Sequence, residues 1–290
     1  MQHNYAVFGM DLAPGTLSAD VAVWVGDICD PAFVQDVILA VCPTHIFHMA
    51  ALTTAYGDLE ALYKVNVQGT RHVLDAVHRA GLDPVILIPG SCAVYGMIDP
   101  DDLPIRESQP FRPSSSYAVS KITQEMLAYT YYAQYGLKVI RTRAFNLVGP
   151  GQPSSLVGSA FTQQIAQIEA GRIEPVLRVG DLTAQRDFVD VRDVVHAYRL
   201  AAERGQPGDA YNVCSGVGIS IRTCLDELLA LTKISVQVVQ EPARMRPSDI
   251  PVSVGDSSLL QGQTGWRPII PLRQSLADLL EDWRQRIKEA

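Results

Sequence analysis

Short apolar segments alternate with longer amphipathic segments along the first half of the chain. Residues 58–80 and 117–135 have apolar positions at helical spacing, and each segment ends before a glycine. Strands joined by helical crossovers predict an α/β fold with a doubly wound parallel sheet. The expected strands are apolar enough to be buried on both faces: Tyr5–Asp11, Val21–Asp27, His45–Ala50, Val85–Pro89 and Leu137–Arg143.

The pattern becomes less regular after Pro150, where a Gly/Pro-rich loop begins. Helices and strands still alternate, but they are shorter and more widely separated, which predicts a second, smaller α/β lobe. The expected helices cover 156–170, 191–203, 220–232 and a final segment from Leu272, and the expected strands cover 175–179, 210–214 and 236–240. We find no internal repeat and no low-complexity segment.

Composition narrows the possible function classes. The 290 residues are 47% apolar with a net charge of −7, and no run of Lys and Arg exceeds two residues, so we expect no nucleic-acid binding. The sequence has no apolar segment of membrane-spanning length and no signal-peptide pattern at its start. Five cysteines without CxxC spacing indicate reduced thiols. We therefore expect a cytoplasmic protein without membrane or metal sites.

The segment Tyr117-Ala-Val-Ser-Lys121 contains the first candidate chemistry. Residues four apart on a helix share one face, so the phenol and the ammonium would lie together. A nearby cation stabilises a phenolate, so we expect Lys121 to lower the pKa of Tyr117 from its reference value of about 10. A structural alternative stays open, in which the lysine stem covers the edge of the ring.

Polar side chains also follow the predicted strands. Ser91 comes directly after the strand 85–89, and Asp11 and Asp27 end two earlier strands. Open α/β sheets bind ligands at the carboxyl ends of their strands, which makes these side chains candidates for a site. Each also has a structural alternative, because Ser and Asp commonly bond to the backbone in turns.

Together these features resemble the extended short-chain dehydrogenase/reductase family, also called the NAD-dependent epimerase/dehydratase family. The resemblance covers nearly the whole chain and is specific in combination. Its motifs are His48-Met-Ala-Ala51, Asn66 in KVNVQGT, Ser91 with Val94-Tyr95-Gly96, Tyr117-Ala-Val-Ser-Lys121, Arg143-Ala-Phe-Asn146, Gly149-Pro-Gly151 and Arg186-Asp-Phe-Val-Asp190. The resemblance implies a dinucleotide-binding lobe over 1–152, to which roughly 186–215 also contribute, and a sugar-nucleotide lobe over 153–290.

The resemblance implies a role for each matching residue. Tyr117 would be the general acid, Lys121 its electrostatic partner and Ser91 the donor to the reacting oxygen, which are the groups a carbonyl needs while it gains a hydride. Asp11 would bind the adenosine ribose, which favours NAD while NADP stays open. The NAD or NADP cofactor would contact Asp11, Asp27, Ile28, His48, Ala50, Ala51, Asn66, Tyr117 and Lys121.

The residues after Ser91 distinguish between members of the family. Family dehydratases have acidic residues there, whereas this chain has Cys92 and Ala93, which cannot supply the acid or base for loss of water. The C-terminal half resembles reductases that convert GDP-4-dehydro-6-deoxy-D-mannose to GDP-D-rhamnose. The resemblance implies that Ser91 also contacts this GDP-sugar substrate, together with Asn146, Arg186, Arg244, Arg246 and Asp249. Guanidinium groups match phosphate oxygens, and a carboxylate accepts from ribose hydroxyls.

One family feature is absent from the sequence. The family's sheet begins with a strand, a glycine-rich turn and a helix that binds the cofactor pyrophosphate, but the 21 glycines contain no GxGxxG or GxxGxxG spacing. Residues 1–11 match the family's second strand, so roughly 25 residues, which hold the family's first strand, glycine-rich turn and helix, have no counterpart in the sequence. Either the natural polypeptide begins upstream, which we favour, or this homologue has lost dinucleotide binding.

Three hypotheses follow from the sequence. The first is a reductase of a GDP-linked 4-keto-6-deoxy sugar, the second a nucleotide-sugar 4-epimerase with tightly bound NAD, and the third a non-catalytic sugar-nucleotide binder that has lost the cofactor loop. By analogy with the family we also expect a homodimer formed through the helices 58–80 and 117–135.

Overall fold

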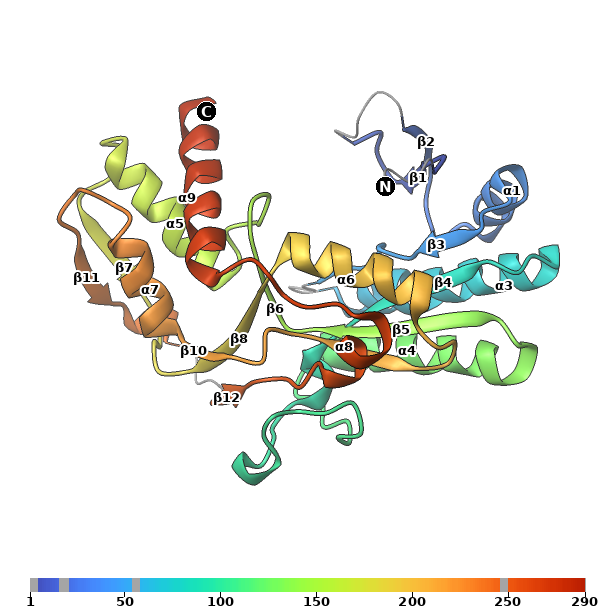
Figure 1. The fold of residues 1–290 in the computed structure, drawn as a ribbon. Coiled ribbons are helices and arrows are strands. Elements are labelled where there is room, and N and C mark those ends of the chain that lie inside the picture. Colours follow the sequence, from blue (N-terminus) through green and yellow to red (C-terminus); the bar gives the residue numbers. More distant parts are fainter. Residues whose placement is uncertain (1–4, 16–20, 54–57, 246–249, 290) are drawn as a thin grey trace. The chain divides into compact units, whose positions relative to one another are not determined.

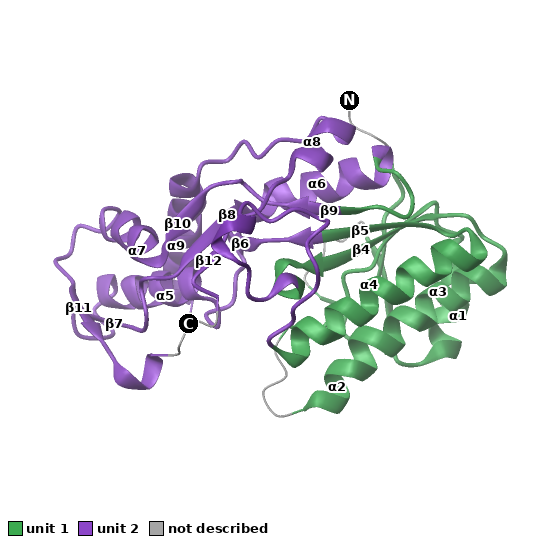
Figure 2. Cartoon of the chain, turned by 90° about the horizontal axis from the view of Figure 1, so that it is seen from below, with its two compact units in different colours: residues 1–94, 115–142, 205–210 green, residues 95–114, 143–204, 211–290 purple. Residues whose placement is uncertain are grey.

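The computed structural model describes residues 5–15, 21–53, 58–245 and 250–289. The chain forms two compact units (Figure 2). Unit 1 contains residues 1–94, 115–142 and 205–210, and unit 2 contains residues 95–114, 143–204 and 211–290. The predicted division of function at residue 152 stays a prediction.

Parallel strand pairs form the sheets of unit 1, as the sequence predicts. β1 pairs with β2, and β3 pairs with β4, both in parallel. The strands of this unit, two of which continue into unit 2, are β1 (Phe8–Asp11), β2 (Ala22–Val25), β3 (His45–Phe47), β4 (Val85–Ser91), β5 (Lys138–Ala144) and β9 (Ala210–Val213). Among the described strands, β1-β2 form one sheet and β3-β4-β5-β9 form another.

The helices of unit 1 lie along one face of β4 and β5 (Figure 2). They are α1 (Pro31–Val41), α2 (Leu59–Tyr63), α3 (Thr70–Ala80) and α4 (Ser116–Tyr135). Asp30, Asp58 and Ser115 cap the N-termini of α1, α2 and α4 through their side chains. Apolar side chains from α1, α3, α4, β4 and β5 make the core of this unit.

The predicted helix over 58–80 is not continuous. A single π-helical turn, η1 (Lys64–Gly69), separates α2 from α3 and contains Asn66. Such turns are uncommon and often lie at functional sites. Hydrophobic spacing cannot detect one extra residue in a turn, so the interruption is visible only in the structure.

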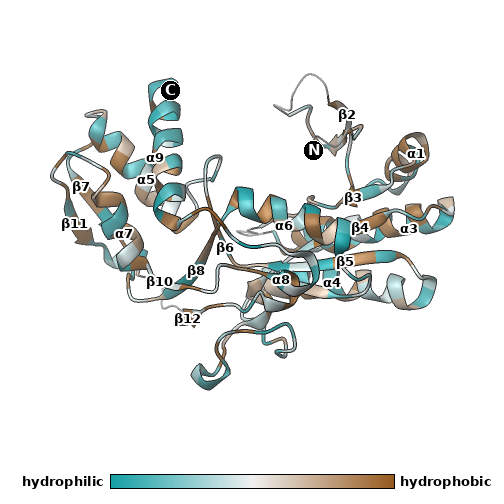
Figure 3. Ribbon diagram, in the orientation of Figure 1, coloured by the Kyte–Doolittle hydropathy of each residue, from teal (hydrophilic) through white to brown (hydrophobic). Residues whose placement is uncertain are grey.

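Unit 2 has its own core between α5, α7 and α9. Helix α6 has alternating teal and brown positions, which is the amphipathic pattern of a half-buried helix (Figure 3). Its helices are α5 (Val157–Glu169), α6 (Val191–Arg204), α7 (Ile221–Leu229), α8 (Ser258–Thr264) and α9 (Leu272–Glu289) (Figure 1). Short 3-10 turns are η2 (Cys92–Tyr95), which begins in unit 1, η3 (Pro100–Asp102) and η4 (Pro242–Arg244).

The strands of unit 2 centre on β8, which the sequence analysis did not identify. β8 (Gln185–Asp190) pairs with β6, β10 and β12, while β7 and β11 form a separate parallel pair. The other strands are β6 (Asn146–Val148), β7 (Val176–Val179), β10 (Gly218–Ser220), β11 (Gln237–Gln240) and β12 (Val252–Ser253). β8 includes Arg186 and two aspartates, so its hydrophobic pattern is too weak to predict a strand.

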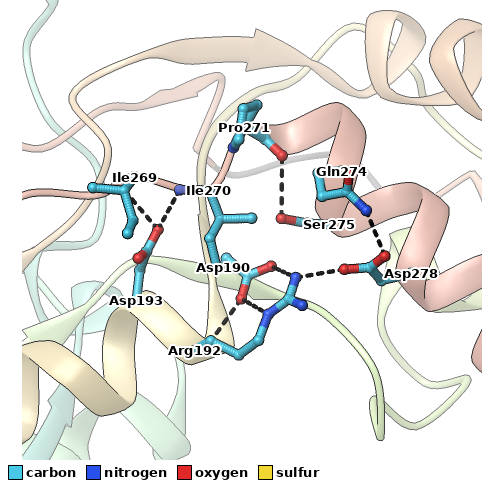
Figure 4. Close-up of polar contacts among 9 residues, drawn as sticks. All are labelled: Asp190, Arg192, Asp193, Ile269, Ile270, Pro271, Gln274, Ser275 and Asp278. Carbon is cyan, nitrogen blue, oxygen red and sulfur yellow. Dashed lines mark hydrogen bonds and ion pairs between the residues drawn. The ribbon is translucent and has the colours of Figure 1, made fainter.

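Carboxylates near the start of α6 attach the C-terminal part of unit 2 (Figure 4). Asp193 accepts the backbone N–H groups of Ile269 at 3.0 Å and Ile270 at 2.9 Å. Arg192 joins Asp190 to Asp278, with N–O distances of 2.8 and 2.7 Å. These contacts fix the start of α9 against α6.

Candidate active site

Ser91 and Tyr117 lie together in unit 1. Ser91 is the last residue of β4, and its Oγ accepts the backbone N–H of Ala93 at 3.2 Å. Tyr117 is in the first turn of α4, which begins where the Ser115 side chain caps it. The Ser91 hydroxyl lies close enough to the phenol to lower its pKa by hydrogen bonding. The structure therefore brings two of the three predicted catalytic side chains near each other.

Lys121 lies one helical turn after Tyr117 and is 5% exposed. Its Nζ donates to the backbone oxygen of Pro89 at 2.8 Å and to Oε1 of Gln124 at 2.7 Å. Burial lowers the pKa of this ammonium to about 8. An ammonium has three N–H donors, and within the described part of the chain these two hydrogen bonds use two of them, which leaves one for a ligand.

The expected effect of Lys121 on Tyr117 is wrong for this structure. Burial raises the pKa of the Tyr117 phenol above its ordinary value, and the hydrogen bond with Ser91 only partly opposes this. A negative charge on Cys92 would raise it further. Lys121 is bonded to Pro89 and Gln124, so desolvation, and not the ammonium, dominates at the phenol.

Asp11 and Asp27 lie at the carboxyl ends of β1 and β2. The Asp11 carboxylate accepts the N–H of Ala13 at 3.3 Å, and that of Asp27 accepts the N–H of Cys29 at 2.8 Å. This backbone bond lowers the pKa of Asp27. The turn role considered in the sequence analysis is thus observed, and both side chains are still accessible at the strand ends where a nucleotide would bind.

The other predicted cofactor residues are mostly buried. His48 is 5% exposed, and burial followed by the charge of Lys121 lowers the pKa of its ring to about 4. Ile28 is 8% exposed, and its carbonyl accepts from Nδ1 of His72 at 3.0 Å. Ala50 and Ala51 follow β3 and are half-buried. These positions can shape a pocket, but none supplies a proton near pH 7.

Asn66 is fully buried in the π-helical turn η1. Its Oδ1 accepts the N–H of Leu52 at 2.7 Å, and its Nδ2 donates to the oxygen of Leu52 and to Ser120 Oγ, both at 3.0 Å. Asn66 therefore holds the segment after β3 against α4. The sequence analysis did not identify three polar neighbours of this region: Thr70, Ser120 and Gln124. The spacing of Gln124 from Lys121, three residues along one helix, is a signal that could have identified it.

Apart from Ser91 in unit 1, the predicted substrate residues that are described lie in unit 2. Asn146 starts β6 and donates through Nδ2 to the oxygen of Asp187 at 3.2 Å. Arg186 lies on β8 and donates to the backbone oxygen of Gln185 at 2.7 Å, while Arg244 is bonded to Glu241 at 2.7 Å. Arg246 and Asp249 lie outside the described residues.

A groove of about 550 Å³ in unit 2 is in the size range of small-molecule sites. Arg178, Arg244, Gln163 and Gln164 are among its lining residues. The Gln164 amide bonds the backbone of Arg178 at both ends, with its Oε1 accepting at 3.0 Å and its Nε2 donating at 3.2 Å. Glu174 also lines the groove, and both arginines are paired with carboxylates, Arg178 with Glu174 and Arg244 with Glu241.

The residues of unit 1 fit the two ends of a nicotinamide dinucleotide. Lys121 has a donor for a ribose hydroxyl, and Asp11 and Asp27 have carboxylates for the adenosine. The pyrophosphate-binding glycine turn is not found in the sequence. Within the described ranges, no group of three or more His, Cys, Asp or Glu could hold a metal ion. None of the described helices is long and apolar enough to cross a membrane.

Comparisons with known proteins agree on the family. The profile of the GDP-mannose 4,6 dehydratase family matches residues 11–279. GDP-6-deoxy-D-mannose reductase from Pseudomonas aeruginosa is 36% identical over 250 residues, covering 85% of this chain and 82% of that protein. UDP-glucose 4-epimerase from Streptomyces lividans is 28% identical over 280 residues, covering 91% of this chain and 82% of that protein.

Solved structures give the same result. RMD from Pseudomonas aeruginosa, solved in complex with NADPH, superposes with a TM-score of 0.87 at 30% identity, covering 97% of this chain and 99% of that chain. UDP-glucose 4-epimerase from Thermotoga maritima, solved with UDP-glucose, superposes with a TM-score of 0.89 at 25% identity, covering 98% of this chain and 92% of that chain.

The predicted resemblance is therefore confirmed. The fold is a Rossmann-like α/β fold with parallel sheets. Relatives of this kind are NAD(P)-dependent sugar-nucleotide oxidoreductases, epimerases and dehydratases. The chain belongs to the GDP-mannose 4,6-dehydratase family of extended short-chain dehydrogenases/reductases.

Proposed function

We propose that the protein reduces the 4-keto group of a GDP-linked 4-keto-6-deoxy sugar with NADH or NADPH, converting GDP-4-dehydro-6-deoxy-D-mannose to GDP-D-rhamnose. The observation that supports this most is the proximity of Ser91 and Tyr117, with the buried Lys121 one helical turn after Tyr117. Cys92 and Ala93 follow Ser91. These residues supply what a ketone reduction needs and lack the carboxylate that a dehydration needs.

Each residue has a defined part in this reaction. Bound NADH or NADPH supplies the hydride. The Ser91 hydroxyl donates to the keto oxygen, which gains negative charge as the hydride arrives. Tyr117 gives its proton to that oxygen, and Lys121 binds the nicotinamide ribose through its one remaining N–H donor.

Substrate recognition is assigned to unit 2. Arg186 and Arg244 would bind the diphosphate, with Asn146 beside them, and Arg246 and Asp249 would complete the site. Guanidinium groups form paired hydrogen bonds with phosphate oxygens. The groove that Arg244 lines with Arg178 supports this assignment, because it places cations and amides on one surface.

Cofactor binding is a separate part of the proposal. We infer that the 290 residues lack a glycine-rich turn of the family's kind, because the sequence has no such spacing and β1 and β3 belong to different sheets in the described part. The chain as given should then bind NADPH weakly. Fusing the first strand, turn and helix of the Pseudomonas reductase to its N-terminus should restore binding, measured by calorimetry.

The reductase activity is tested with the chain and with this fusion. Incubation with GDP-4-dehydro-6-deoxy-D-mannose should oxidise NADH or NADPH, and the product should be identified as GDP-D-rhamnose by NMR. Failure of the fusion to oxidise either cofactor, although it binds both nucleotides, would contradict the proposal.

The similarity to the Thermotoga epimerase supports a second candidate, a nucleotide-sugar 4-epimerase. An epimerase would retain NAD through purification and interconvert sugar epimers without net oxidation of the cofactor. A third outcome, binding of GDP without NADH or NADPH even in the fusion, would identify a non-catalytic sugar-nucleotide binder.

We also propose a homodimer formed through α3 and α4. Tyr129 and Tyr135 on α4 are 44% and 49% exposed and would be covered by the partner copy in such a dimer. Tyr135 also stacks on His78 of α3 with the ring centroids 4.2 Å apart. Light scattering should give twice the mass of the chain, and Tyr129→Glu with Tyr135→Glu should give monomers.

A further inference from the structure

A series of buried hydrogen bonds connects Lys121 to Gln124, Thr70 and His48. Lys121 Nζ donates to Gln124 Oε1 at 2.7 Å, and Gln124 Nε2 donates to Thr70 Oγ1 at 2.8 Å. Thr70 Oγ1 donates to the backbone oxygen of Asn66 at 2.6 Å and lies 2.8 Å from His48 Nε2. All five residues are buried.

The chemistry of these groups fixes the direction of every bond. An ammonium can only donate, so the oxygen of the Gln124 amide must face Lys121 and its NH₂ must face Thr70. A backbone carbonyl can only accept, so the Thr70 hydroxyl gives its single hydrogen to Asn66. Thr70 Oγ1 then accepts from both Gln124 and His48, and His48 must carry a hydrogen on Nε2.

This directionality favours the charged form of Lys121, because the Gln124 oxygen bonds an ammonium more strongly than a neutral amine, which would keep two N–H donors but lose the charge. If the lysine lost its proton and the Gln124 amide turned to donate to it, the amide oxygen would face Thr70. The Thr70 hydroxyl would then have to choose between Gln124 and the Asn66 carbonyl. One of these buried acceptors would be left unsatisfied, which costs about 1–3 kcal/mol. These hydrogen bonds therefore oppose the effect of desolvation, which favours the neutral form of Lys121.

We propose that Gln124 and Thr70 are positioning residues that keep Lys121 protonated and correctly oriented. Neutral His48 ends this series of hydrogen bonds. The inference deepens the proposed function, because it assigns residues that prepare Lys121 for the reaction. Neither residue touches a reacting atom in that mechanism.

The other ionisable groups near Lys121 do not stabilise its charge in place of Gln124 and Thr70. His48 is neutral near pH 7, since burial and the Lys121 charge lower its pKa to about 4. Tyr117 is also neutral, because burial raises its pKa, and Cys92 acts on Tyr117. Glu125, on the same helix, is paired with Arg141 at 3.2 Å. Lys121 thus relies on neutral acceptors for its stabilisation.

The test measures the protonation of Lys121 directly. The full chain has five lysines, so ¹⁵N labelling of lysine allows the Nζ signal of Lys121 to be titrated by NMR. We expect Gln124→Met to lower the Lys121 pKa by about one unit, because the charged form loses an acceptor. Thr70→Val should lower it by about half a unit, since it frees the amide to turn.

Thr70→Ser is the matched control, because it keeps the hydroxyl and should keep the parent titration. Urea unfolding shows which variants are folded, and the Thr70 pair tests the proposal even if Gln124→Met does not fold. Equal Lys121 titrations in Thr70→Val, Thr70→Ser and the parent would overturn the proposal. So would an unchanged titration in folded Gln124→Met.

Kinetics separate this inference from the proposed function. If the cofactor-binding fusion reduces the ketosugar, the alkaline limit of kcat/KM should move to lower pH in Thr70→Val and return in Thr70→Ser. If the fusion has no activity, the proposed function fails, while the NMR titration still decides the role of Gln124 and Thr70.

Discussion

Lys121 in unit 1 and Asp187 in unit 2 are both buried ionisable side chains held by neutral groups. Asp187 accepts four hydrogen bonds, from the N–H and hydroxyl of Ser215 and from the N–H groups of Gly216 and Gly255, at 2.6 to 3.2 Å. Its carboxylate joins β8 to the segments after β9 and β12. Lys121 has two acceptors for three donors in the described residues.

The difference shows how burial can serve structure or chemistry. Burial raises the pKa of Asp187 even though all four hydrogen bonds lower it, so this carboxylate fixes backbone segments at some cost. Burial also disfavours the charged form of Lys121, but the residue keeps a donor for a ligand. A buried group whose hydrogen-bonding capacity is filled can hold backbone segments in place, whereas a buried group with a remaining donor can act on a substrate.

The largest expected effect tests whether the Lys121 region is a catalytic site. Tyr117→Phe removes the proposed proton donor, so the rate of ketosugar reduction by the cofactor-binding fusion should fall about 10²- to 10⁴-fold. Oxidation of reduced nicotinamide measures the rate. Tyr129→Phe, at an exposed position on the same helix, is the control and should keep the parent rate. Equal rates in Tyr117→Phe and the parent would show that Tyr117 is not the proton donor.

A second prediction tests the cost of burying Lys121. Its pKa is lowered from 10.5 to about 8, so the folded chain holds this proton less tightly than the unfolded chain. The free energy of unfolding should therefore rise by up to ~3 kcal/mol as the pH increases from about 8 to 10.5. Urea unfolding of Lys121→Met over this range should lack that rise, whereas Lys233→Met, at an exposed lysine, should keep it. Parallel pH profiles for the parent and Lys121→Met would disprove the assigned cost.

A third prediction tests Asp187 as an anchor. In Asp187→Asn an NH₂ group replaces one carboxylate oxygen and faces backbone N–H donors, so unfolding should require about 2 kcal/mol less free energy. The midpoint of urea unfolding measures this change. Asp101→Asn, at an exposed aspartate of the same unit, should leave the midpoint unchanged. A midpoint unchanged by Asp187→Asn would mean that the four hydrogen bonds contribute nothing net.

The smallest effect belongs to the surface of unit 2. Asp278→Asn weakens one of the two ion pairs of Arg192, whose side chain is 47% exposed. Asp190 remains paired with Arg192, so the loss should stay below about 1 kcal/mol. Salt titration of the unfolding midpoint should show this small difference vanishing at high ionic strength. A loss above 2 kcal/mol would place Asp278 among the buried anchors instead.

Local patterns predicted much of unit 1 correctly. Apolar segments indicated β4 and β5, and the glycines that end α3 and α4 have left-handed backbone, as the sequence pattern required. The Ser91, Tyr117 and Lys121 motif was also visible, because β4 and α4 hold it at fixed spacing. Helix α1 and strand β8 were not identified. β8 is central to unit 2 although its segment includes polar residues. Its pairing with β6, β10 and β12 makes this segment a strand, and its own hydrophobic pattern does not.

The sequence by itself determined the strand–helix alternation, the family motifs and the position of the proposed proton donor, since these depend on neighbouring residues along the chain. Only the tertiary structure decided the environment of each group. Gln124, Thr70 and His48 come from three elements, and their hydrogen bonds exist only when those elements pack. The pKa of Tyr117 changed direction for the same reason: desolvation depends on every atom that surrounds a side chain, and the sequence does not contain that information locally.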